Sequence, residues 1–402
     1  MNRQKSINVN SADFFANEYE HYRWMRENAP VHPGRIGWFM NMMMVSRYDD
    51  AAAMLKDKRF LRNRSTVTGG SRFPVPMPKT FNLMAQSMII EDEPGHRRLR
   101  NLVHKAFTPR MIAKMDASID KWCHELLDKA EKEEQVNLFT AYALPIPITV
   151  ISEMLGVPEE ARGEFIEWSR IFGGTFKPRE LLGMYFGVRS IVRFMRELIE
   201  KRRTEPGDDI LTALIEAEEE GERLSEDELV SMSLLLLAAG FETTTNLIAN
   251  GVRTLLEHPE QLALLREQPE HIDTTVEEIL RYTNPVAGTK PNYASEDLEI
   301  AGIEIPKGTL VMPLIGSANR DESVFDNADT FDITRTPNRH LGFGNGIHYC
   351  LGAPLARLEG KIALNTIINR YPNLRLAVEP SALSYIQRPF THRLTALPVA
   401  LN

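Results

Sequence analysis

Hydrophobic residues recur with the period of an amphipathic helix along most of the chain. Residues 118–135 and 190–209 place apolar positions at helical spacing between charged ones. A longer helix is predicted to begin after Ser225, which forms a capping box with Glu228, and to continue to about Leu256. At ~1.5 Å per residue this helix would be roughly 45 Å long. Its middle is apolar all round, which predicts a course through the protein centre.

Strand patterns are short and few by comparison. Residues 38–46 and 299–313 are the strand candidates, and the proline-rich residues 72–80 are predicted to form a loop. No linker, low-complexity tract or internal repeat divides the sequence. We therefore predict one mainly α-helical domain over residues 1–402, with small β-sheets.

The composition narrows the class of protein. The 402 residues are 43% hydrophobic and 25% charged, which is typical of a globular protein large enough to enclose a bulky cofactor. The net charge of -8 argues against a nucleic-acid partner. Two cysteines suit a reducing compartment, and the first residues lack the apolar core of a signal peptide. With apolar runs shorter than a membrane span, we expect a cytoplasmic protein with no membrane partner.

A cysteine lies among glycines in "FGNGIHYCLG", residues 343–352. Glycines without side chains let a backbone approach a large group closely, which is the role expected of Gly344, Gly346 and Gly352. The same glycines can direct amide N–H groups at the sulfur of Cys350. The simpler alternative is a buried cysteine in a glycine turn.

The residues after Cys350, "CLGAPLAR", predict the start of a helix with Pro354 in its first turn. The partial positive charge at a helix N-terminus is expected to lower the pKa of the thiol. No second cysteine ligand stands beside it, so a zinc or iron–sulfur site is not offered here. A single thiolate suits the axial position of a haem iron.

The loop resembles the haem-binding loop of the cytochrome P-450 superfamily, the haem-thiolate monooxygenases, in the pattern Phe343-Gly344-x-Gly346-x-His348-x-Cys350-Leu351-Gly352. The resemblance extends over nearly the whole chain and is closest to soluble bacterial members. It implies a cytochrome P-450 fold, with haem b between the long central helix and the cysteine loop. Cys350 would be the iron ligand, His348 would reach a haem propionate, and Phe343, Gly344 and Gly352 would bind the cofactor.

The segment "AAGFETTTN", residues 238–246, lies in the middle of the long helix. A run of threonines is unfavourable there, which suggests a site, although a surface glutamate beside a helix-bending threonine is the alternative. The segment resembles the family's distal helix motif. The resemblance implies that Thr243 orients dioxygen-derived ligands and water and that Glu242 helps to deliver protons. Gly240 is expected to leave room beside the helix for a ligand.

Basic side chains are expected to bind the haem propionates. His96 and Arg100 share one helix face at i,i+4, and the "EPGHxxxR" match implies that they bind propionates; the alternative is a solvated basic helix. Many family members have a further propionate-binding arginine where this chain has Asn292. Asparagine cannot supply the charge, so Lys290 is the expected substitute, or one propionate is held more weakly.

A group of charged residues is expected to support the cysteine loop. Glu278 and Arg281 can pair at i,i+3 on a helix, although such pairs are common and weak on a surface. In the family the pair is buried and joined by a second arginine, for which Arg335 stands at the matching place. The implied role is to hold the cysteine loop in register.

The resemblance implies a monooxygenase that inserts one oxygen atom from O2 into a small-to-medium apolar substrate, such as a polyketide, terpenoid, steroid or fatty acid of secondary metabolism. Electrons would come from NAD(P)H through a separate ferredoxin or flavodoxin and its reductase. Two alternatives remain: a peroxide-driven peroxygenase, against which Glu242 and Thr243 argue, and a haem-binding or sensor protein without turnover.

Two further regions are predicted to contact partners. The substrate pocket is expected to involve residues 72–80, the strand after Pro285 and the aromatic region 164–187, although these aromatic residues could simply pack two helices. The outward face of residues 95–110 carries Arg97 and Lys105 and is predicted to dock an acidic electron-transfer protein.

Overall fold

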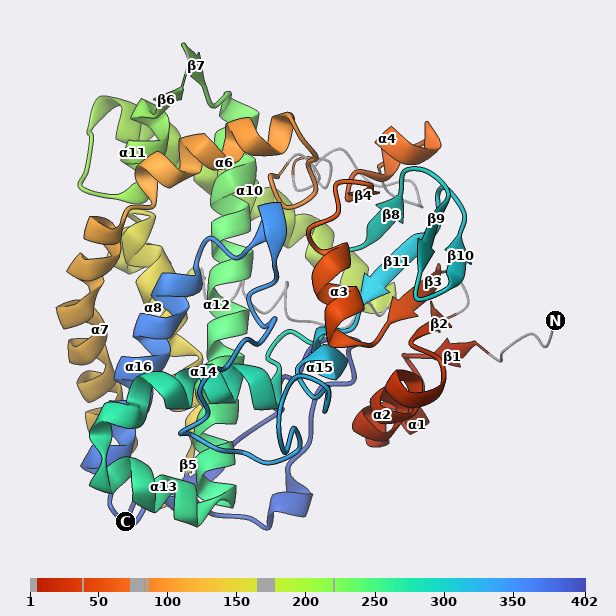
Figure 1. Cartoon of the computed structure of the whole chain (residues 1–402). Helices are drawn as coiled ribbons and strands as arrows, with labels where there is room; N and C mark the ends of the chain where they lie inside the picture. The colour runs from red at the N-terminus through yellow and green to blue at the C-terminus, as the bar shows by residue number, and fades with distance from the viewer. Residues whose placement is uncertain (1–5, 38–39, 73–82, 84–86, 165–177, 220) are drawn as a thin grey trace.

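The computed structural model describes all residues except 1–5, 38–39, 73–82, 84–86, 165–177 and 220 (Figure 1). The helices are α1 (Ala12–Ala16), α2 (Glu18–Asn28), α3 (Tyr48–Met54), α4 (Arg64–Thr68), α6 (Gly95–Ala106), α7 (Pro109–Ala130), α8 (Pro145–Met154), α10 (Pro178–Thr204), α11 (Ile210–Glu216), α12 (Glu226–Glu257), α13 (Pro259–Glu267), α14 (Ile272–Thr283), α15 (Ile315–Ala318) and α16 (Ala353–Arg370). The strands are β1 (Ile7–Asn8), β2 (Val31–Ile36), β3 (Met40–Val45), β4 (Phe60–Leu61), β5 (Val136–Asn137), β6 (Glu218–Glu219), β7 (Glu222–Arg223), β8 (Asn292–Ala294), β9 (Leu298–Ile300), β10 (Ile303–Ile305), β11 (Leu310–Pro313), β12 (Arg375–Leu376) and β13 (Pro398–Ala400).

Helix α12 runs through a bundle of other helices, as its apolar middle predicts (Figure 1). The side chain of Ser225 accepts the backbone N–H of Glu228, and the Glu228 carboxylate accepts the N–H of Ser225, so the predicted capping box is confirmed. By length and composition α12 could cross a membrane, contrary to the expectation from short apolar runs. However, 61% of its apolar stretch is buried inside the protein, as in the core helix of a globular fold.

The two shorter predicted helices are also present, with shifted ends. Residues 118–135 fall largely in α7, which starts earlier because the side chain of Thr108 caps the backbone N–H of Met111 and is followed by Pro109. Residues 190–209 fall largely in α10, which ends at Thr204, shortly before a proline. The extent of one domain over residues 1–402 stays a prediction.

The main sheet has the strand order β1-β2-β3-β11-β8-β4 and lies beside the helical bundle (Figure 1). The strand predicted at 38–46 is confirmed by β3, whose described part starts at Met40. The segment 299–313 forms parts of three strands, because the chain turns at Ala301, whose φ is 50°, and again before β11. Strand β2, which contains Pro33, has no counterpart among the predicted strands.

A partly buried ion pair joins α2 to the C-terminal segment. Nε2 of His392 lies 2.6 Å from the Glu18 carboxylate, and Nδ1 donates to the carbonyl of Thr283 at 2.7 Å. Burial alone would lower the pKa of His392, but the Glu18 carboxylate raises it to about 10. Burial alone would raise the pKa of Glu18, but the His392 imidazolium holds it below 4.5.

These shifts predict that the pair stabilises the fold in a defined pH window. The His392 contribution is complete below its unfolded pKa of about 6.5 and is lost as the pH rises toward 10; the Glu18 contribution is lost in acid. We expect His392→Gln to lower the free energy of unfolding by about 3 kcal/mol at pH 6, and by much less at pH 10. Urea unfolding at both pH values measures this, with exposed His124→Gln as control. A difference that does not shrink with pH would contradict it.

Candidate active site

Packing between α12 and α16 brings the cysteine loop level with the middle of α12. Gly360 packs on Leu247, where an added Cβ would lie 3.0 Å from the leucine, and Leu364 packs on Gly251, where the Cβ would lie 3.1 Å away. The two contacts advance by four residues along both helices, so the helices run in the same direction here. When the same register is continued toward the N-termini of both helices, the first turn of α16 lies level with Gly240.

Backbone groups surround the thiol of Cys350. Its own N–H donates to the carbonyl of Phe343 at 2.9 Å, and the backbone N–H groups of Gly352 and Ala353 donate to its sulfur. Helix α16 begins at Ala353 with Pro354 in its first turn, as predicted. Burial nevertheless raises the pKa of Cys350, so the expected lowering is wrong: desolvation of the thiolate outweighs the two amides and the nearby Arg100.

Two glycines of the loop have conformations that other residues rarely adopt. Gly344 has φ +73° and Gly346 has φ +71°. A Cβ on Gly346 would lie 2.3 Å from the carbonyl oxygen of Leu55, just after α3. The close approach at Gly346 is therefore to the α3 backbone, whereas Gly352 contributes an amide to the sulfur.

One side of α12 is exposed at this level, and we call the space beside that side the hollow. Ala239 is exposed, although Leu237 and Phe241 on the other faces of the same turns are buried. The hydroxyl of Thr243 lies on this exposed side and donates to the carbonyl of Ala239 at 2.8 Å. Such bonds to the carbonyl four residues earlier satisfy the hydroxyl within the helix, which is how α12 accommodates its threonines.

Glu242 takes part in an ion pair instead of bonding Thr243. Its carboxylate accepts a hydrogen bond from Arg388 and lies 3.8 Å from Nη1 of Arg393. Both arginines come from the C-terminal segment, far along the chain, and no local pattern around Glu242 indicated them. Gly240, two residues before Glu242, faces α8, where an added Cβ would lie 3.5 Å from Ile151.

The basic residues of α6 lie against the cysteine loop. The rings of His96 and His348 are 4.3 Å apart, and Arg100 donates to the carbonyls of Ile347 (3.1 Å) and Tyr349 (2.8 Å). Burial and then the Arg100 charge lower the pKa of His96 to about 4, and burial and then the Arg62 charge lower that of His348 to about 2. Both imidazoles are thus neutral at pH 7 in this arrangement, so the expected cationic pair of α6 is reduced to Arg100.

The side chains around the loop fit haem. Arg62 and Arg100 lower the pKa of both histidines, and buried carboxylates such as propionates would offset this excess of positive charge. Nε of Arg62 is buried and has no hydrogen-bond partner within the described part of the chain. In that same part no three His, Cys, Asp or Glu side chains form a group that could hold a metal ion, so Cys350 stands as a single thiol donor.

The buried motif below the loop is confirmed. Arg281 donates to both carboxylate oxygens of Glu278 at 2.8 and 2.7 Å, and both side chains are fully buried. Arg335 joins the same carboxylate at 3.2 Å, and Asn338 donates to it at 3.0 Å. The carboxylate therefore holds the segment that precedes the cysteine loop.

A second carboxylate supports the loop directly and was missed in the sequence. Glu277 accepts from Arg357 at 2.6 and 2.9 Å and lies 3.1 Å from His340, and these contacts lower its pKa to about 2 despite burial, which acts in the opposite direction. The Arg357 guanidinium also lies over the ring of Phe343, 4.5 Å from its centre. The only signal in the sequence is that Glu277 adjoins Glu278.

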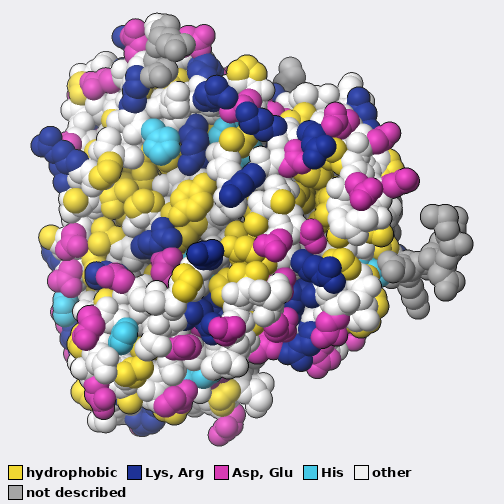
Figure 2. Space-filling view, in the orientation of Figure 1, with side chains coloured by type: hydrophobic (Ala, Val, Ile, Leu, Met, Phe, Trp, Pro, Cys, Tyr) yellow, Lys and Arg dark blue, Asp and Glu magenta, His cyan; other side chains and the backbone are white. Residues whose placement is uncertain are grey.

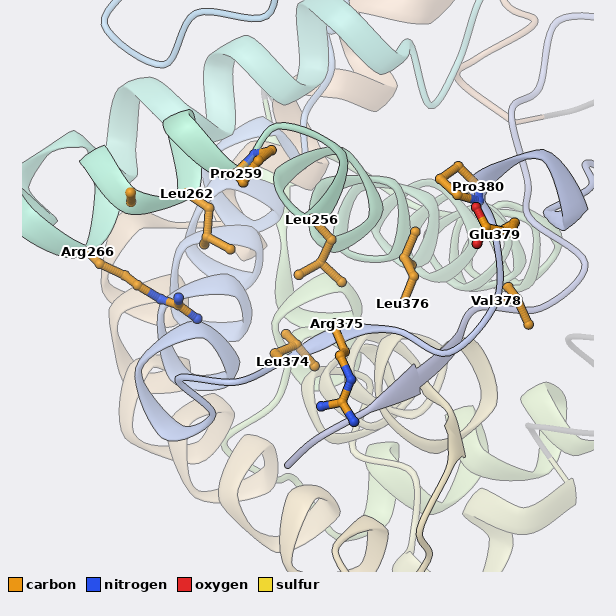
Figure 3. Close-up of a pocket in the computed structure, with 11 residues that line it drawn as sticks. Leu256, Pro259, Leu262, Arg266, Leu374, Arg375, Leu376, Val378, Glu379 and Pro380 are labelled. Carbon is orange, nitrogen blue, oxygen red and sulfur yellow. The ribbon is translucent and has the colours of Figure 1, made fainter.

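The predicted substrate regions are described only in part. Most of the proline-rich loop and of the aromatic region 164–187 lies outside the described residues. Of the aromatic side chains in that region, the structure describes that of Phe186, which is 57% exposed. Figure 3 shows a different pocket, of about 490 Å³, at the C-terminal end of α12. It is lined by Leu256, Leu262 and Arg266 among others, and Arg266 already donates to the carbonyl of Tyr371, so we assign it no part in the chemistry.

The outward face of α6 is less basic than the sequence predicts. Arg97 pairs with Glu93 at 2.7 Å, Arg98 pairs with Glu228, and Lys105 donates to a backbone carbonyl at 2.5 Å. Figure 2 shows acidic side chains interspersed with the basic ones over α6 and the β6–β7 hairpin. The acids offset the charges of Arg97 and Arg98, and the docking of an acidic electron-transfer protein on this face stays a prediction.

Comparisons with a family model, with curated sequences and with solved structures all match cytochromes P450. The family model described as Cytochrome P450 matches residues 175–374. The chain is 40% identical over 395 residues to the polyketide biosynthesis cytochrome P450 PksS of Bacillus subtilis (strain 168), covering 97% of each chain. The solved structure of PksS from Bacillus subtilis 168 gives a TM-score of 0.92 at 39% identity, over 98% of this chain and 100% of that one.

A second solved structure, P450BioI in complex with hexadec-9Z-enoic acid ligated acyl carrier protein, gives a TM-score of 0.88 at 39% identity, over 97% of this chain and 100% of that one. The 6-deoxyerythronolide B hydroxylase of Saccharopolyspora erythraea is 39% identical over 405 residues, covering 98% of each chain.

The chain belongs to the cytochrome P450 family. The predicted fold class, mainly helical with small sheets, is confirmed. Membership makes the protein an oxygen-incorporating oxidoreductase with haem b as its cofactor.

Proposed function

We propose that the protein is a bacterial cytoplasmic monooxygenase that inserts one oxygen atom from O2 into a small-to-medium apolar substrate of secondary metabolism. Electrons come from NAD(P)H through a separate ferredoxin or flavodoxin and its reductase. One observation carries the proposal: the Cys350 thiol, with two backbone N–H donors, lies level with the hollow beside Thr243. When bound, haem b supplies the reducible iron at which dioxygen is activated.

In this proposal Cys350 is the iron ligand, and the amides of Gly352 and Ala353 stabilise its thiolate by donating to the sulfur. Phe343 contributes its carbonyl to the loop, and Gly344 contributes the left-handed turn. The ion pair and hydrogen bonds of Glu277 and Glu278 hold this loop from below, so that the thiol keeps a fixed position.

On the α12 side of the site, we assign proton transfer to Thr243 and Glu242. The Thr243 proton is donated to the Ala239 carbonyl, so the hydroxyl presents its lone pairs to the hollow and can accept from bound water or a protonated ligand. Arg388 holds the Glu242 carboxylate one residue away, from where it can exchange protons with water in the hollow. Gly240 faces Ile151 of α8, so its expected role of leaving room for a ligand stays a prediction.

The propionates are assigned to the basic cluster between α6 and the cysteine loop. His96 and His348 lie ring against ring there, and Arg100 ties α6 to the loop. Bound carboxylates would favour the protonated imidazoles and so reverse the depressed pKa of both histidines.

The substrate class is proposed from the relatives. PksS is named for polyketide biosynthesis, and P450BioI was solved with a fatty acid on an acyl carrier protein. We propose that the apolar substrate of this chain is likewise a fatty-acyl chain or a polyketide. The alternatives are a peroxide-driven peroxygenase and a haem protein without turnover.

The test is the origin of the inserted oxygen. Candidate substrates are first selected by the shift they cause in the haem Soret band. Turnover with NAD(P)H, a ferredoxin and its reductase under ¹⁸O₂ is expected to place one ¹⁸O atom in the product. Faster turnover with hydrogen peroxide alone would favour the peroxygenase, and substrate binding with no substrate-dependent NAD(P)H consumption would favour the non-catalytic protein.

A further inference from the structure

Strands β4 and β8 set an arginine opposite the asparagine that breaks the family pattern. The strands are antiparallel, with Phe60 opposite Ala294 and Leu61 opposite Tyr293. Continued by one residue, the register sets Arg62 opposite Asn292. Residues directly opposite each other in an antiparallel pair project from the same face of the sheet, with Cβ atoms about 4.5–5.5 Å apart.

The asparagine itself is used locally. Nδ2 of Asn292 donates to the hydroxyl of Thr289 at 3.0 Å and to the carbonyl of Lys290 at 2.9 Å, and the residue is buried. This short side chain closes the turn before β8. It supplies no charge and leaves the space beyond it to a longer side chain.

Arg62 is anchored at its backbone and incompletely paired at its tip. Its backbone N–H donates to the Asp92 carboxylate at 2.7 Å, and Nη1 donates to the carbonyl of Ile89 at 3.1 Å. Nε is buried without a partner among the residues that the structure describes. An unsatisfied buried donor on a charged group is costly, which indicates that an acceptor is missing.

The charge of Arg62 acts at the place where propionates are expected. After burial and Arg100, the Arg62 charge contributes to the depressed pKa of His96, and burial lowers the pKa of Arg62 itself to about 10 although Asp92 acts in the other direction. Lys290 also lies near Arg62, and burial and the charges of Arg62 and Arg388 lower its pKa, with the Glu242 carboxylate acting in the other direction.

We propose that Arg62 binds a haem propionate, supplying from the neighbouring strand the guanidinium that is missing at Asn292. A cationic side chain thus reaches the same propionate, but it comes from the residue after β4 and not from the position of Asn292 in β8. The inference rests on the proposed haem site at Cys350. It assigns the role to Arg62 and not to Lys290.

The test compares haem b with its dimethyl ester, in which both propionates are uncharged. Loss of haem to excess apomyoglobin is followed in wild type, Arg62→Gln and the control Arg64→Gln, whose partly buried side chain donates to the carbonyl of Ser71. We expect haem b to leave Arg62→Gln about 10- to 100-fold faster than wild type, as for a lost charged hydrogen bond. With the ester, the two proteins should differ little, and Arg64→Gln should match wild type throughout.

A swap across the two strands separates recognition from general damage. Adding Asn292→Arg to Arg62→Gln should restore slow loss of haem b. An equal loss of haem b and ester from Arg62→Gln, or an ester-dependent effect in Lys290→Gln instead, would overturn the proposal. The reduced, carbon monoxide-bound spectrum of Arg62→Gln should keep the thiolate band; loss of that band in wild type would count against the haem site itself.

Discussion

Replacing Cys350 with alanine is expected to abolish the red-shifted Soret band of the reduced, carbon monoxide-bound protein. That band reports thiolate ligation, and the only other cysteine of the sequence, Cys123, is buried in α7. Burial raises the pKa of Cys123 to about 12, so it would stay a thiol. The measurement is the carbon monoxide difference spectrum of dithionite-reduced protein at equal haem content.

The matched control is Cys123→Ala, which removes the other sulfur. It should keep the band at full height, with at most a loss of stability of a few kcal/mol from the cavity it leaves in the core. A red-shifted band that persists in Cys350→Ala would show that another group binds the iron. A band lost in Cys123→Ala would show that the two thiols had been assigned the wrong way round.

Local sequence patterns predicted the elements that carry the site. The capping box at Ser225, the proline in the first turn of α16 and the helix that presents His96 and Arg100 all depend on residues within a few positions of one another. Such rules depend only on residues that are neighbours in the chain, so they can be recognised in a single sequence. The buried Glu278 motif was predicted because a known family pattern supplied the distant arginine.

Contacts between distant segments could not be predicted in this way. Glu242 meets Arg388 across 146 positions, and Glu277 meets Arg357 across 80. Strand register sets Arg62 opposite Asn292 across an even longer separation, and register depends on the assembled sheet. The same holds for the outward charges of α6, because the acids that pair with Arg98 come from β7 and α12.

The error in the expected pKa of Cys350 has a similar origin. The helix N-terminus and its amides could be predicted from the sequence, and the amides lower the pKa of the thiol, as expected. The extent of burial was not legible, because it depends on how the loop packs against the core. Burial is the larger of the two effects here, and in the proposed holoenzyme the iron itself would stabilise the thiolate.

Removing the hydroxyl of Thr243 is expected to divert reducing equivalents away from product. In Thr243→Ala the cysteine loop is untouched, so haem content and the thiolate band should be unchanged. The hollow would lose the hydroxyl that accepts hydrogen bonds at its wall, where Ala239 leaves the helix exposed. A positioned proton-transfer group is typically worth about 10²–10⁴ in rate, so product formation should fall while peroxide release rises.

The chain offers a control of the same chemical kind two residues away. Thr245 also donates to the carbonyl four residues earlier, that of Phe241, at 2.8 Å, but it is buried on another side of α12. Thr245→Ala removes an equivalent helix bond without changing the hollow. Product and hydrogen peroxide formed per NAD(P)H consumed should therefore shift in Thr243→Ala and stay near wild type in Thr245→Ala. Equal ratios in wild type and Thr243→Ala would refute the assigned role, and equal shifts in both variants would attribute the effect to the helix bond instead.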